Sequence, residues 1–493
     1  MRRPLNIFVV ASEVDPYSKT GGLADVTRSL SKALFRLGHK VVVVTPFYEQ
    51  TIEAKKFNLS PAIQPQVIEL EQDMNVEVEF LKGELLPRLP VYFLKQDKYF
   101  GKRKELYGSS HENLRFALFD LASLYLLKWL NFKPDIIQCH DWHTGFVPFF
   151  LQKHHCFTSD PFYHSLATVF TIHNLAFQFG HNWWEVKNED RDDGRSPVPS
   201  FRDPLFENVN FAKRGILYAT LTNTVSERYA EEILTQELGQ DLHRILSNRQ
   251  DRVFGIINGI DYKDYNPATD AGITENFGID AMGGKKDNKA YVQRKFGLQV
   301  NPDIPLITMV SRISEQKGFD LVMEIMEPLM RMDLQFLVVG GGEKKYEDFF
   351  RVWSKNHPKK CAAHLEFDAK QATQMYAASD MFLMPSRFEP CGLGQLISLR
   401  YGSIPIVHTT GGFADTISDF NPKTGRGNGF EFKTYDSRDL LVAITRALET
   451  YKHRDMWKSL VVQGMKKSFS WEIPARKYVA LFRKAMKIAK RIE

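Results

Sequence analysis

Short apolar runs, each followed by a helical pattern, recur along this chain and restrict its fold more than any other feature. The first run is 7–10 and the next is 41–45, and between them apolar residues share one helical face that ends at Gly38. Further runs at 135–139 and 168–172 continue the series. Strands that alternate with helices return to the same edge of a sheet, so they pair in parallel. The pattern predicts an α/β fold with a doubly wound parallel sheet.

The series of strands and helices starts a second time after Asn258-Gly-Ile-Asp261. A polar, glycine-rich stretch precedes a new buried strand at 306–310. Further strands are expected at 334–339, 365–367, 381–384 and 404–407. At 493 residues the chain is too long for one ordinary core. We therefore predict two Rossmann-like domains, 1–261 and 262–473.

The composition is that of an ordered globular protein, with 43% hydrophobic and 25% charged residues. No apolar run reaches the ~20 residues that a spanning helix needs, and no leader pattern precedes the first strand, so we expect a cytoplasmic protein with no membrane partner. The net charge of +6 comes without an RNA-binding signature or zinc-finger spacing, so no nucleic-acid partner is expected. The four cysteines are widely scattered, which favours reduced thiols over disulfides.

Two segments place functional side chains between a strand and a helix. The first, Lys19-Thr-Gly-Gly-Leu-Ala-Asp-Val26, lies at the first turn between a strand and a helix. The second, 382–397, is interpreted as a strand, a turn with Arg387 and Glu389, and a helix that opens at Gly392. Ligands of open α/β domains bind at the carboxyl ends of the strands, where helix N-termini favour an anion. Lys19 adds a charge suited to a phosphate, although a lysine in a tight turn is often only solvated.

The segment Ser311-Arg-Ile-Ser-Glu-Gln-Lys-Gly-Phe-Asp320 follows the first strand of the second domain. Two cations in it, Arg312 and Lys317, can clamp a diphosphate and stabilise the negative charge that grows on a leaving group. Glu389 should stay ionised beside a helix N-terminus, where it binds sugar hydroxyls or caps the helix. Cys391 has the spacing of a nucleophile, but a small residue packed at the helix start fits better because no partnered base is evident.

Polar clusters follow two strands of the first domain. They are His140-Asp-Trp-His-Thr-Gly145 and Ile172-His-Asn-Leu175. Aspartate, histidine and asparagine make the directional hydrogen bonds that sugar hydroxyls require. Two other interpretations stay open: hydrogen-bonded residues with a structural role, and a zinc site. A zinc site on Cys139, His140 and His143 would lack a second Cys/His pair.

Together these segments resemble those of bacterial glycogen synthases and plant starch synthases, over nearly the whole chain. The resemblance implies the GT-B architecture, in which two Rossmann-like domains face a cleft and the terminal helix, here 474–493, completes the first domain. It also implies retaining transfer of glucose from ADP-glucose to the non-reducing end of an α-1,4-glucan such as glycogen or a maltooligosaccharide. The alternatives are a GT-B transferase with another nucleotide sugar, such as UDP-glucose, and an inactive glucan-binding paralogue.

No metal or other cofactor is expected. The Asp-x-Asp motif that bridges a metal to a nucleotide sugar in other transferases is missing from the matched loops, and arginine and lysine charge can serve instead. The resemblance implies a catalytic set of Lys19, Asp141, His173, Arg312, Lys317 and Glu389. The implied nucleotide-sugar set shares Lys19, Arg312, Lys317 and Glu389 and adds Gly22, Asp25, Asn174, Asn258, Phe367, Cys391, Gly392, Leu393, Thr410, Gly411 and Gly412.

The polar segment 181–202 is the expected path of the acceptor. Trp183 and Trp184 lie in it, and indole faces suit the apolar face and hydroxyl rim of a sugar ring. The competing interpretation is a small hydrophobic cluster that pins the loop. The family commonly has Ala-Tyr-Gln-Gly where this chain has Ala176-Phe-Gln-Phe-Gly180, and often a tryptophan where it has Tyr265. The preferred length of the acceptor chain therefore stays open.

Overall fold

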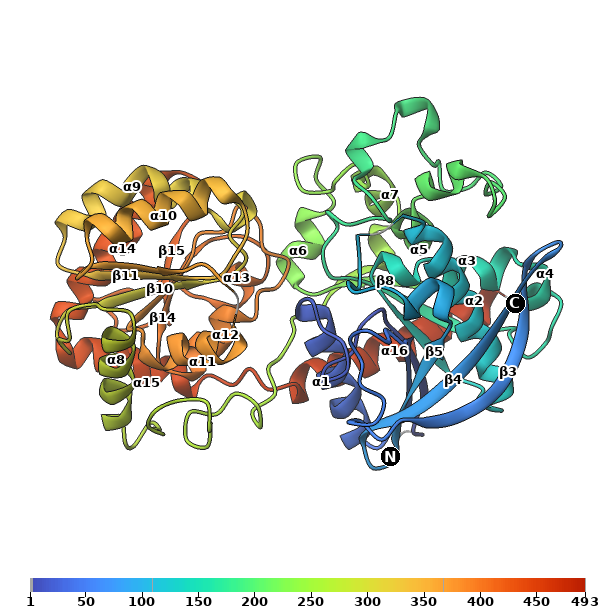
Figure 1. Cartoon of the computed structure of the whole chain (residues 1–493), viewed down its shortest axis with the longest axis horizontal. Helices are drawn as coiled ribbons and strands as arrows, with labels where there is room; N and C mark the ends of the chain where they lie inside the picture. The colour runs from blue at the N-terminus through green and yellow to red at the C-terminus, as the bar shows by residue number, and fades with distance from the viewer. Residues whose placement is uncertain (1–2, 109, 367, 493) are drawn as a thin grey trace. The chain divides into compact units, whose positions relative to one another are not determined.

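The computed structural model describes residues 3–108, 110–366 and 368–492, and the chain divides into two compact units (Figure 1). Unit 1 comprises Met1–Asn258 and Trp471–Glu493, and unit 2 comprises Gly259–Ser470. The boundaries expected from the sequence, after 261 and 473, lie a few residues beyond the observed ones. Each unit contains its own sheet covered by helices, as the alternating pattern predicted.

The sheet of unit 1 has the strand order β3-β4-β5-β2-β1-β6-β7-β8-β9 within the described residues. Its parallel part consists of β1 (Asn6–Val10), β2 (Lys40–Pro46), β5 (Leu89–Lys95), β6 (Ile136–His140), β7 (Ala167–Ile172), β8 (Leu221–Thr224) and β9 (Val253–Gly255). The strand order reverses between β1 and β6, and such a switch point is where doubly wound folds bind ligands. An antiparallel hairpin of β3 (Ser60–Glu71) and β4 (Met74–Leu86) extends the sheet beyond β5.

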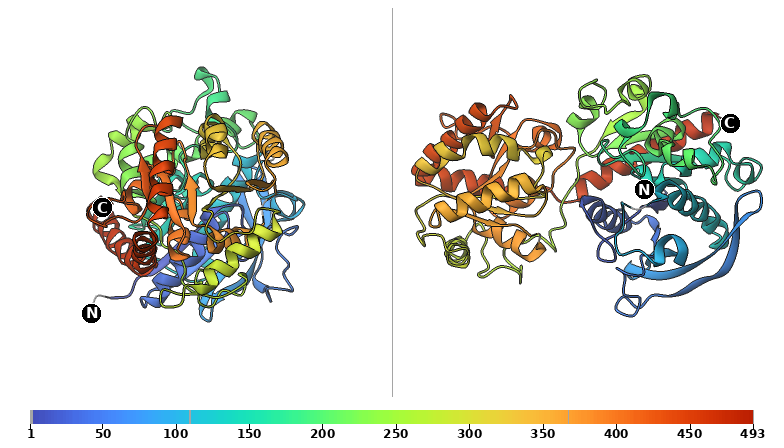
Figure 2. Two further views of the ribbon diagram at one scale, coloured as in Figure 1. Left: turned by 90° about the vertical axis from the view of Figure 1, so that its left-hand side faces the viewer. Right: turned by 45° about the horizontal axis from the view of Figure 1, so that its top comes forward.

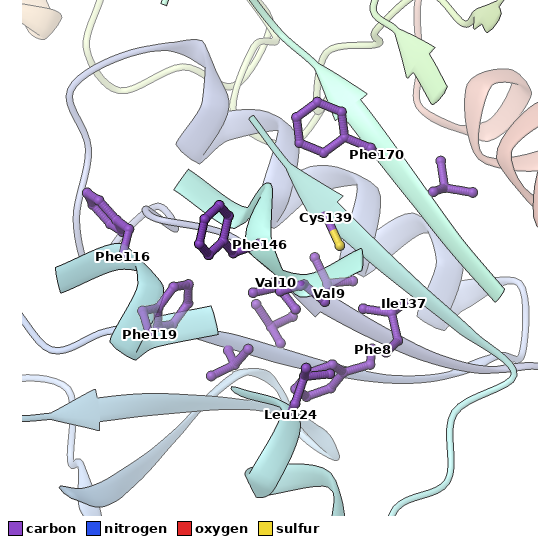
Figure 3. Close-up of a cluster of buried hydrophobic side chains, with 14 of the residues drawn as sticks. Phe8, Val9, Val10, Phe116, Phe119, Leu124, Ile137, Cys139, Phe146 and Phe170 are labelled. Atoms are coloured by element: carbon purple, nitrogen blue, oxygen red, sulfur yellow. The ribbon is translucent and has the colours of Figure 1, made fainter. Parts of the chain in front are cut away.

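The helices of unit 1 cover this sheet. They are α1 (Gly22–Arg36), α2 (Glu112–Trp129), α3 (Phe146–Lys153), α4 (His155–Thr158), α5 (Phe211–Tyr218), α6 (Glu227–Glu232), α7 (His243–Ser247) and α16 (Glu472–Ile492). The last helix, α16, packs on β6, β7 and α1, so the C-terminal end of the chain is part of unit 1 (Figure 2). Figure 3 shows the core between the sheet and the helices, where Phe8 and Ile137 come from neighbouring strands and Phe116 and Phe146 from α2 and α3.

Unit 2 contains a parallel sheet of strand order β12-β11-β10-β13-β14-β15 within the described residues. Its strands are β10 (Leu306–Val310), β11 (Gln335–Val339), β12 (Cys361–His364), β13 (Met381–Met384), β14 (Ile404–His408) and β15 (Phe430–Phe432). Counted along the chain this order is 3-2-1-4-5-6, that of a Rossmann fold, with its switch point between β10 and β13. The predicted fold class is therefore confirmed.

Helices lie on both faces of this second sheet (Figure 1). They are α8 (Gly283–Lys295), α9 (Phe319–Arg331), α10 (Lys344–Asn356), α11 (Ala369–Ala378), α12 (Gly394–Arg400), α13 (Gly411–Thr416), α14 (Ser437–Lys452) and α15 (Arg454–Lys466). Within the described part of the chain, none of the helices in either unit is both long and apolar enough to cross a bilayer.

Two local predictions for unit 2 are wrong. Residues 365 and 366 of the strand expected at 365–367 are not in a strand, and residue 367 lies outside the described residues. The strand beside β11 is instead Cys361–His364, where the small residues Cys361 and Ala362 are buried. The helix expected to open at Gly392 begins at Gly394, because Gly392 adopts a left-handed φ of +70° that a helix does not allow.

Candidate active site

The turn after β1 in unit 1 is held by a buried carboxylate. Glu13 Oε2 accepts hydrogen bonds from the backbone N–H of Thr20 at 2.6 Å and from its hydroxyl at 2.9 Å. Burial raises the pKa of Glu13 to about 7. Sequence reasoning missed Glu13, and the available signal was an acidic residue soon after a buried strand that ends at the switch point.

The predicted residues of this turn come together. Lys19 Nζ pairs with Asp25 Oδ1 at 2.6 Å, and burial raises the pKa of Asp25 while the lysine opposes that shift. Gly22 begins α1, and a Cβ on Gly21 would meet no atom within 4 Å, so the backbone faces open space that a ligand can enter. The Lys19–Asp25 pair thus lies at a helix N-terminus that is open to an anionic ligand.

The ends of β6 and β7 bring together the polar residues that the sequence places there. Asp141 accepts the backbone N–H of His173 at 2.9 Å and also that of Asn174. Burial raises the pKa of Asp141 to about 7, and its φ of +59° is unusual for a residue with a side chain. His140 Nδ1 lies 2.9 Å from His173 Nε2, and burial lowers the pKa of His173 to about 3. Near pH 7 His173 is therefore neutral, and Asp141 is near the midpoint of its ionisation.

The other residues around this cluster have mainly packing contacts. The His143 ring lies between Trp142 and Tyr107, at centroid distances of 4.0 and 4.6 Å, and burial lowers its pKa well below the usual value. Within the described residues, Cys139, His140 and His143 do not form a group with metal-ligand spacing. The open zinc interpretation thus finds no geometric support in this cluster.

The switch point of unit 2 carries a nearly buried ion pair. Lys317 Nζ lies 2.6 Å from Glu389 Oε2, and their side chains are 18% and 10% exposed. The Ser386 hydroxyl also donates to Glu389 Oε2, at 3.1 Å. Gly318 has φ +78°, and a Cβ there would lie 2.0 Å from the Pro385 carbonyl oxygen, so only glycine lets the loop after β10 approach the loop after β13. The two predicted segments therefore meet through this pair.

Two arginines near this pair differ in their partners. Arg312 is exposed, and its side chain makes no hydrogen bond or ion pair with the described residues. Arg387 instead bonds Glu315 at 3.0 Å and Asp320 at 3.3 Å and lies over the Tyr435 ring. Arg312 is thus available to a ligand, whereas Arg387 holds the loop.

The predicted glycine-rich turns pack backbone against backbone. A Cβ on Gly411 would lie 2.0 Å from the Glu389 carbonyl oxygen, and one on Gly412 would lie 2.0 Å from that of Cys391. The Gly412 N–H also donates to the Glu389 carbonyl at 3.1 Å. The turn that starts at Thr410, the N-cap of α13, therefore fixes the backbone of the catalytic glutamate predicted from the sequence.

The remaining predicted residues have varied surroundings. Leu393 is the N-cap residue of α12, after Gly392. The Asn258 side chain is buried, and its oxygen has no hydrogen-bond partner among the described residues. Phe367 lies outside the described residues. Trp183 packs against the core of unit 1 with Arg191 over its ring at 5.5 Å, whereas Trp184 is 54% exposed.

Comparisons with known proteins agree with this geometry. Residues 6–248 match the starch synthase catalytic domain family, and residues 293–460 match the glycosyl transferases group 1 family. The chain is 42% identical over 492 residues to a glycogen synthase of Moorella thermoacetica, covering 99% of this chain and 98% of that one. It is also 42% identical to a glycogen synthase of Desulforudis audaxviator, covering 98% of this chain and 97% of the other.

Two solved structures are also similar to this chain. The catalytic domain of starch synthase IV from Arabidopsis thaliana, bound to ADP and acarbose, is 31% identical with a TM-score of 0.86, covering 98% of this chain and all of that one. A sucrose-phosphate synthase from Thermosynechococcus elongatus shares the fold, with a TM-score of 0.60, 18% identity, and coverage of 97% of this chain and 98% of its own.

The two Rossmann-like units and their sites define a glycosyltransferase of the GT-B class. Within that class, the chain belongs to the glycogen synthase family.

Proposed function

We propose that this glycosyltransferase moves glucose from ADP-glucose, with retention of configuration, to the non-reducing end of an α-1,4-glucan. The single observation that carries the proposal is the Lys317–Glu389 pair at the switch point of unit 2, at 2.6 Å. It puts a cation and a carboxylate together where a Rossmann fold binds a nucleotide. The ADP and acarbose bound by the related starch synthase IV support a nucleotide diphosphate and an oligosaccharide as ligands.

In this proposal unit 2 binds the donor. Lys317 and Arg312 balance the charge that develops on the diphosphate as the bond between glucose C1 and its oxygen breaks. Glu389 accepts hydrogen bonds from glucose hydroxyls once Lys317 turns toward the phosphate. The backbone around Cys391, Gly392, Leu393 and Thr410–Gly412 approaches the nucleotide sugar, and Phe367 belongs to the same set by resemblance. Arginine and lysine carry the positive charge, so we propose that no metal or other cofactor takes part.

Unit 1 supplies the groups that act on the sugar side. Lys19, beside Gly22 and Asp25, adds a charge for the diphosphate. The buried side-chain oxygen of Asn258 can accept a hydrogen bond from the substrate. Asp141, His173 and Asn174 bind hydroxyls of the transferred glucose and of the acceptor. In the transfer, C1 forms a bond to the acceptor hydroxyl oxygen, and the proton of that hydroxyl passes to the departing diphosphate. We infer that both events occur on the same face of the sugar.

The two tryptophans have different roles in the proposed acceptor path. Trp183 holds the loop, because Arg191 covers one face of its ring and its other contacts are with the core. Trp184 offers an exposed indole beside it, with 5.7 Å between the ring centroids. We assign the contact with the glucan chain to Trp184.

One assay tests the proposal against its alternatives. Purified protein is given ADP-glucose or UDP-glucose with glycogen or a maltooligosaccharide, and transfer and the configuration of the product linkage are measured. The expected result is α-1,4 extension with ADP-glucose preferred. Preference for UDP-glucose would replace the donor assignment, and glycogen binding without any transfer would identify an inactive glucan-binding paralogue.

A further inference from the structure

A histidine–histidine–cysteine cluster lies on unit 1 and takes no part in the proposed transfer. It consists of the consecutive residues His154, His155 and Cys156, at the junction between α3 and α4. His155 is exposed, and the other two are half-buried, so an ion in solution can reach all three. The sequence analysis did not single out these residues, because three adjacent positions match no metal-binding motif.

The chain geometry explains why adjacent residues converge here. His154 follows the end of α3 in an extended conformation, with φ −84° and ψ 126°, and α4 begins at His155. This break in the helix turns the His154 ring back over the next residue, so the two rings stack with centroids 4.8 Å apart and planes at 21°. In a continuous helix, neighbouring side chains would point about 100° apart.

The spacing of the ligand atoms is close to that of a metal site. One nitrogen of each histidine and the Cys156 sulfur all lie within 4.8 Å of one another. The contact between Cys156 Sγ and His155 Nε2 is 3.3 Å. Zinc bonds of about 2.3 Å to sulfur and about 2.0 Å to nitrogen, at tetrahedral angles, put such atoms about 3.5 Å apart. The Cys156 sulfur and the His155 nitrogen are therefore already near coordination distance. Because the two histidine rings are stacked with nearly parallel planes, one imidazole must also rotate before both nitrogens can point at one ion.

The existing contacts of the cluster are weak enough to be exchanged for a metal. His154 Nδ1 accepts the backbone N–H of Cys156 at 3.4 Å, a long hydrogen bond. The pKa of Tyr125 is raised by burial and then by the neighbouring Cys156 side chain, so its hydroxyl lies near that sulfur, and its ring stacks on Trp129 at 5.8 Å. A hydroxyl that donates to a thiolate both stabilises its charge and orients it toward a metal.

We propose that His154, His155 and Cys156 bind one transition-metal cation of the zinc class, with water as a fourth ligand. Two imidazoles and a thiolate favour zinc or its neighbours over magnesium or calcium, which prefer oxygen ligands. Binding replaces the thiol proton by the metal and releases that proton to solvent. The ion would join the end of α3 to α4 and so fix this junction, apart from the chemistry of glucose transfer.

Direct titration of the tag-free, reduced protein tests the proposal. Zn²⁺ binding is measured by calorimetry, and Co²⁺ is used as a probe because a cobalt–thiolate bond gives a charge-transfer absorption band. The expected result is one equivalent of metal with that band. Cys139, Cys361 and Cys391 are all buried, so the band would report on Cys156.

Variants decide which residues hold the ion. Cys156→Ser should abolish the charge-transfer band, and His155→Ala should abolish the one-equivalent binding step. Tyr125→Phe should weaken binding about tenfold, as is typical when a residue that orients a metal ligand is lost. His164→Ala is the matched control, because this exposed histidine lies on the same unit outside the cluster. Each variant is first checked for wild-type transferase activity, which reports on folding.

Two results would overturn the assignment. One is a Co²⁺ complex of the wild-type protein without a thiolate band. The other is Zn²⁺ affinity and stoichiometry that are the same in wild type, Cys156→Ser and His155→Ala. Loss of metal binding in His164→Ala as well would show that the ion is bound outside the proposed residues.

Discussion

The two switch points of this chain share one topology but differ in charge. At β1 and β6 of unit 1, Glu13 and Asp141 are buried with pKa values raised to about 7, and His173 is neutral because its pKa is about 3. At β10 and β13 of unit 2, Lys317 and Glu389 form an ion pair at 2.6 Å. The edge of unit 1 thus combines the Lys19–Asp25 ion pair with carboxyl and imidazole groups whose pKa shifts favour the neutral form, whereas the edge of unit 2 presents a nearly buried ion pair.

This difference matches the two parts of a nucleotide sugar. Sugar hydroxyls need directional donors and acceptors, and neutral groups supply these without a large cost of removing charge from water. A diphosphate needs compensating positive charge, and a preorganised cation provides most when charge grows on the leaving group. In the proposed function, the residues that follow each strand let one fold bind sugar hydroxyls mainly on unit 1, where Lys19 adds one cation, and the diphosphate mainly on unit 2.

The largest expected effect comes from removing Lys317, the cation that pairs with Glu389 in unit 2. Lys317→Ala should lower kcat by about 10²- to 10³-fold, the usual result of losing one donor that stabilises developing negative charge. The apparent affinity for glycogen should stay within a few-fold of wild type. Steady-state kinetics with each substrate varied measure both quantities.

Lys355→Ala is the matched control for that substitution, because Lys355 is an exposed lysine in the last turn of α10. It should leave kcat unchanged. Near-normal turnover in Lys317→Ala would show that this lysine does not stabilise charge on the leaving group. The proposed difference in role between the two switch points would then be wrong.

The raised pKa of Glu13 predicts a pH dependence of stability. Its folded pKa of about 7 exceeds the unfolded value of 4.5, so the native protein holds a proton that the unfolded chain has lost. Stability should fall as pH rises through this window, by up to about 3 kcal/mol for this shift. Glu13→Gln, which keeps an acceptor oxygen for Thr20, should therefore gain melting temperature over wild type at pH 8 but not at pH 4.5.

Glu237→Gln is the control for this measurement, because Glu237 is an exposed carboxylate of the same unit. It should show the same small effect at both pH values. If Glu13→Gln behaves like this control, Glu13 is ionised in the native protein, and unit 1 is more highly charged than we infer.

Arg312 tests whether an exposed cation of unit 2 without a bonding partner among the described residues binds the donor. Arg312→Ala should lower kcat/KM for the nucleotide sugar by about tenfold or more, since a hydrogen bond to a charged group contributes about 1.5–3 kcal/mol. The melting temperature should not change, because this exposed side chain has no bonding partner among the described residues. A lower melting temperature with unchanged donor kinetics would give Arg312 a structural role instead.

The sequence predicted the pairing of site residues best where strand topology determines it. The bounds expected for β10 and β13 agree with the structure, and these strands are neighbours, so the loops that carry Lys317 and Glu389 had to meet. The approach of Asp141 to His173 follows in the same way from the pairing of β6 with β7. Strand pairing therefore allows the sequence to predict which distant residues lie in one cluster.

Other features were not predictable, because they depend on packing. The place of Glu13 soon after a buried strand was a weak signal that matches no motif, and its burial against the turn is what separates it from a solvated carboxylate. The β3–β4 hairpin was missed because its outer strand is largely exposed and polar, so it lacks the apolar run of a buried strand. The strand after α10 was placed too late because its residues, a cysteine, two alanines and a histidine, give a weaker apolar signal than Leu365.

The smallest expected effect separates the two tryptophans of unit 1. Trp184→Ala should raise the apparent KM for glycogen by up to about tenfold, since an aromatic contact contributes about 0.5–1.5 kcal/mol. Its melting temperature should stay at the wild-type value, because the ring is 54% exposed. Trp183→Ala should do the reverse, because that ring packs on the core and under Arg191. Equal effects of both variants on KM at unchanged stability would assign both rings to the acceptor, and equal losses of stability would make both structural.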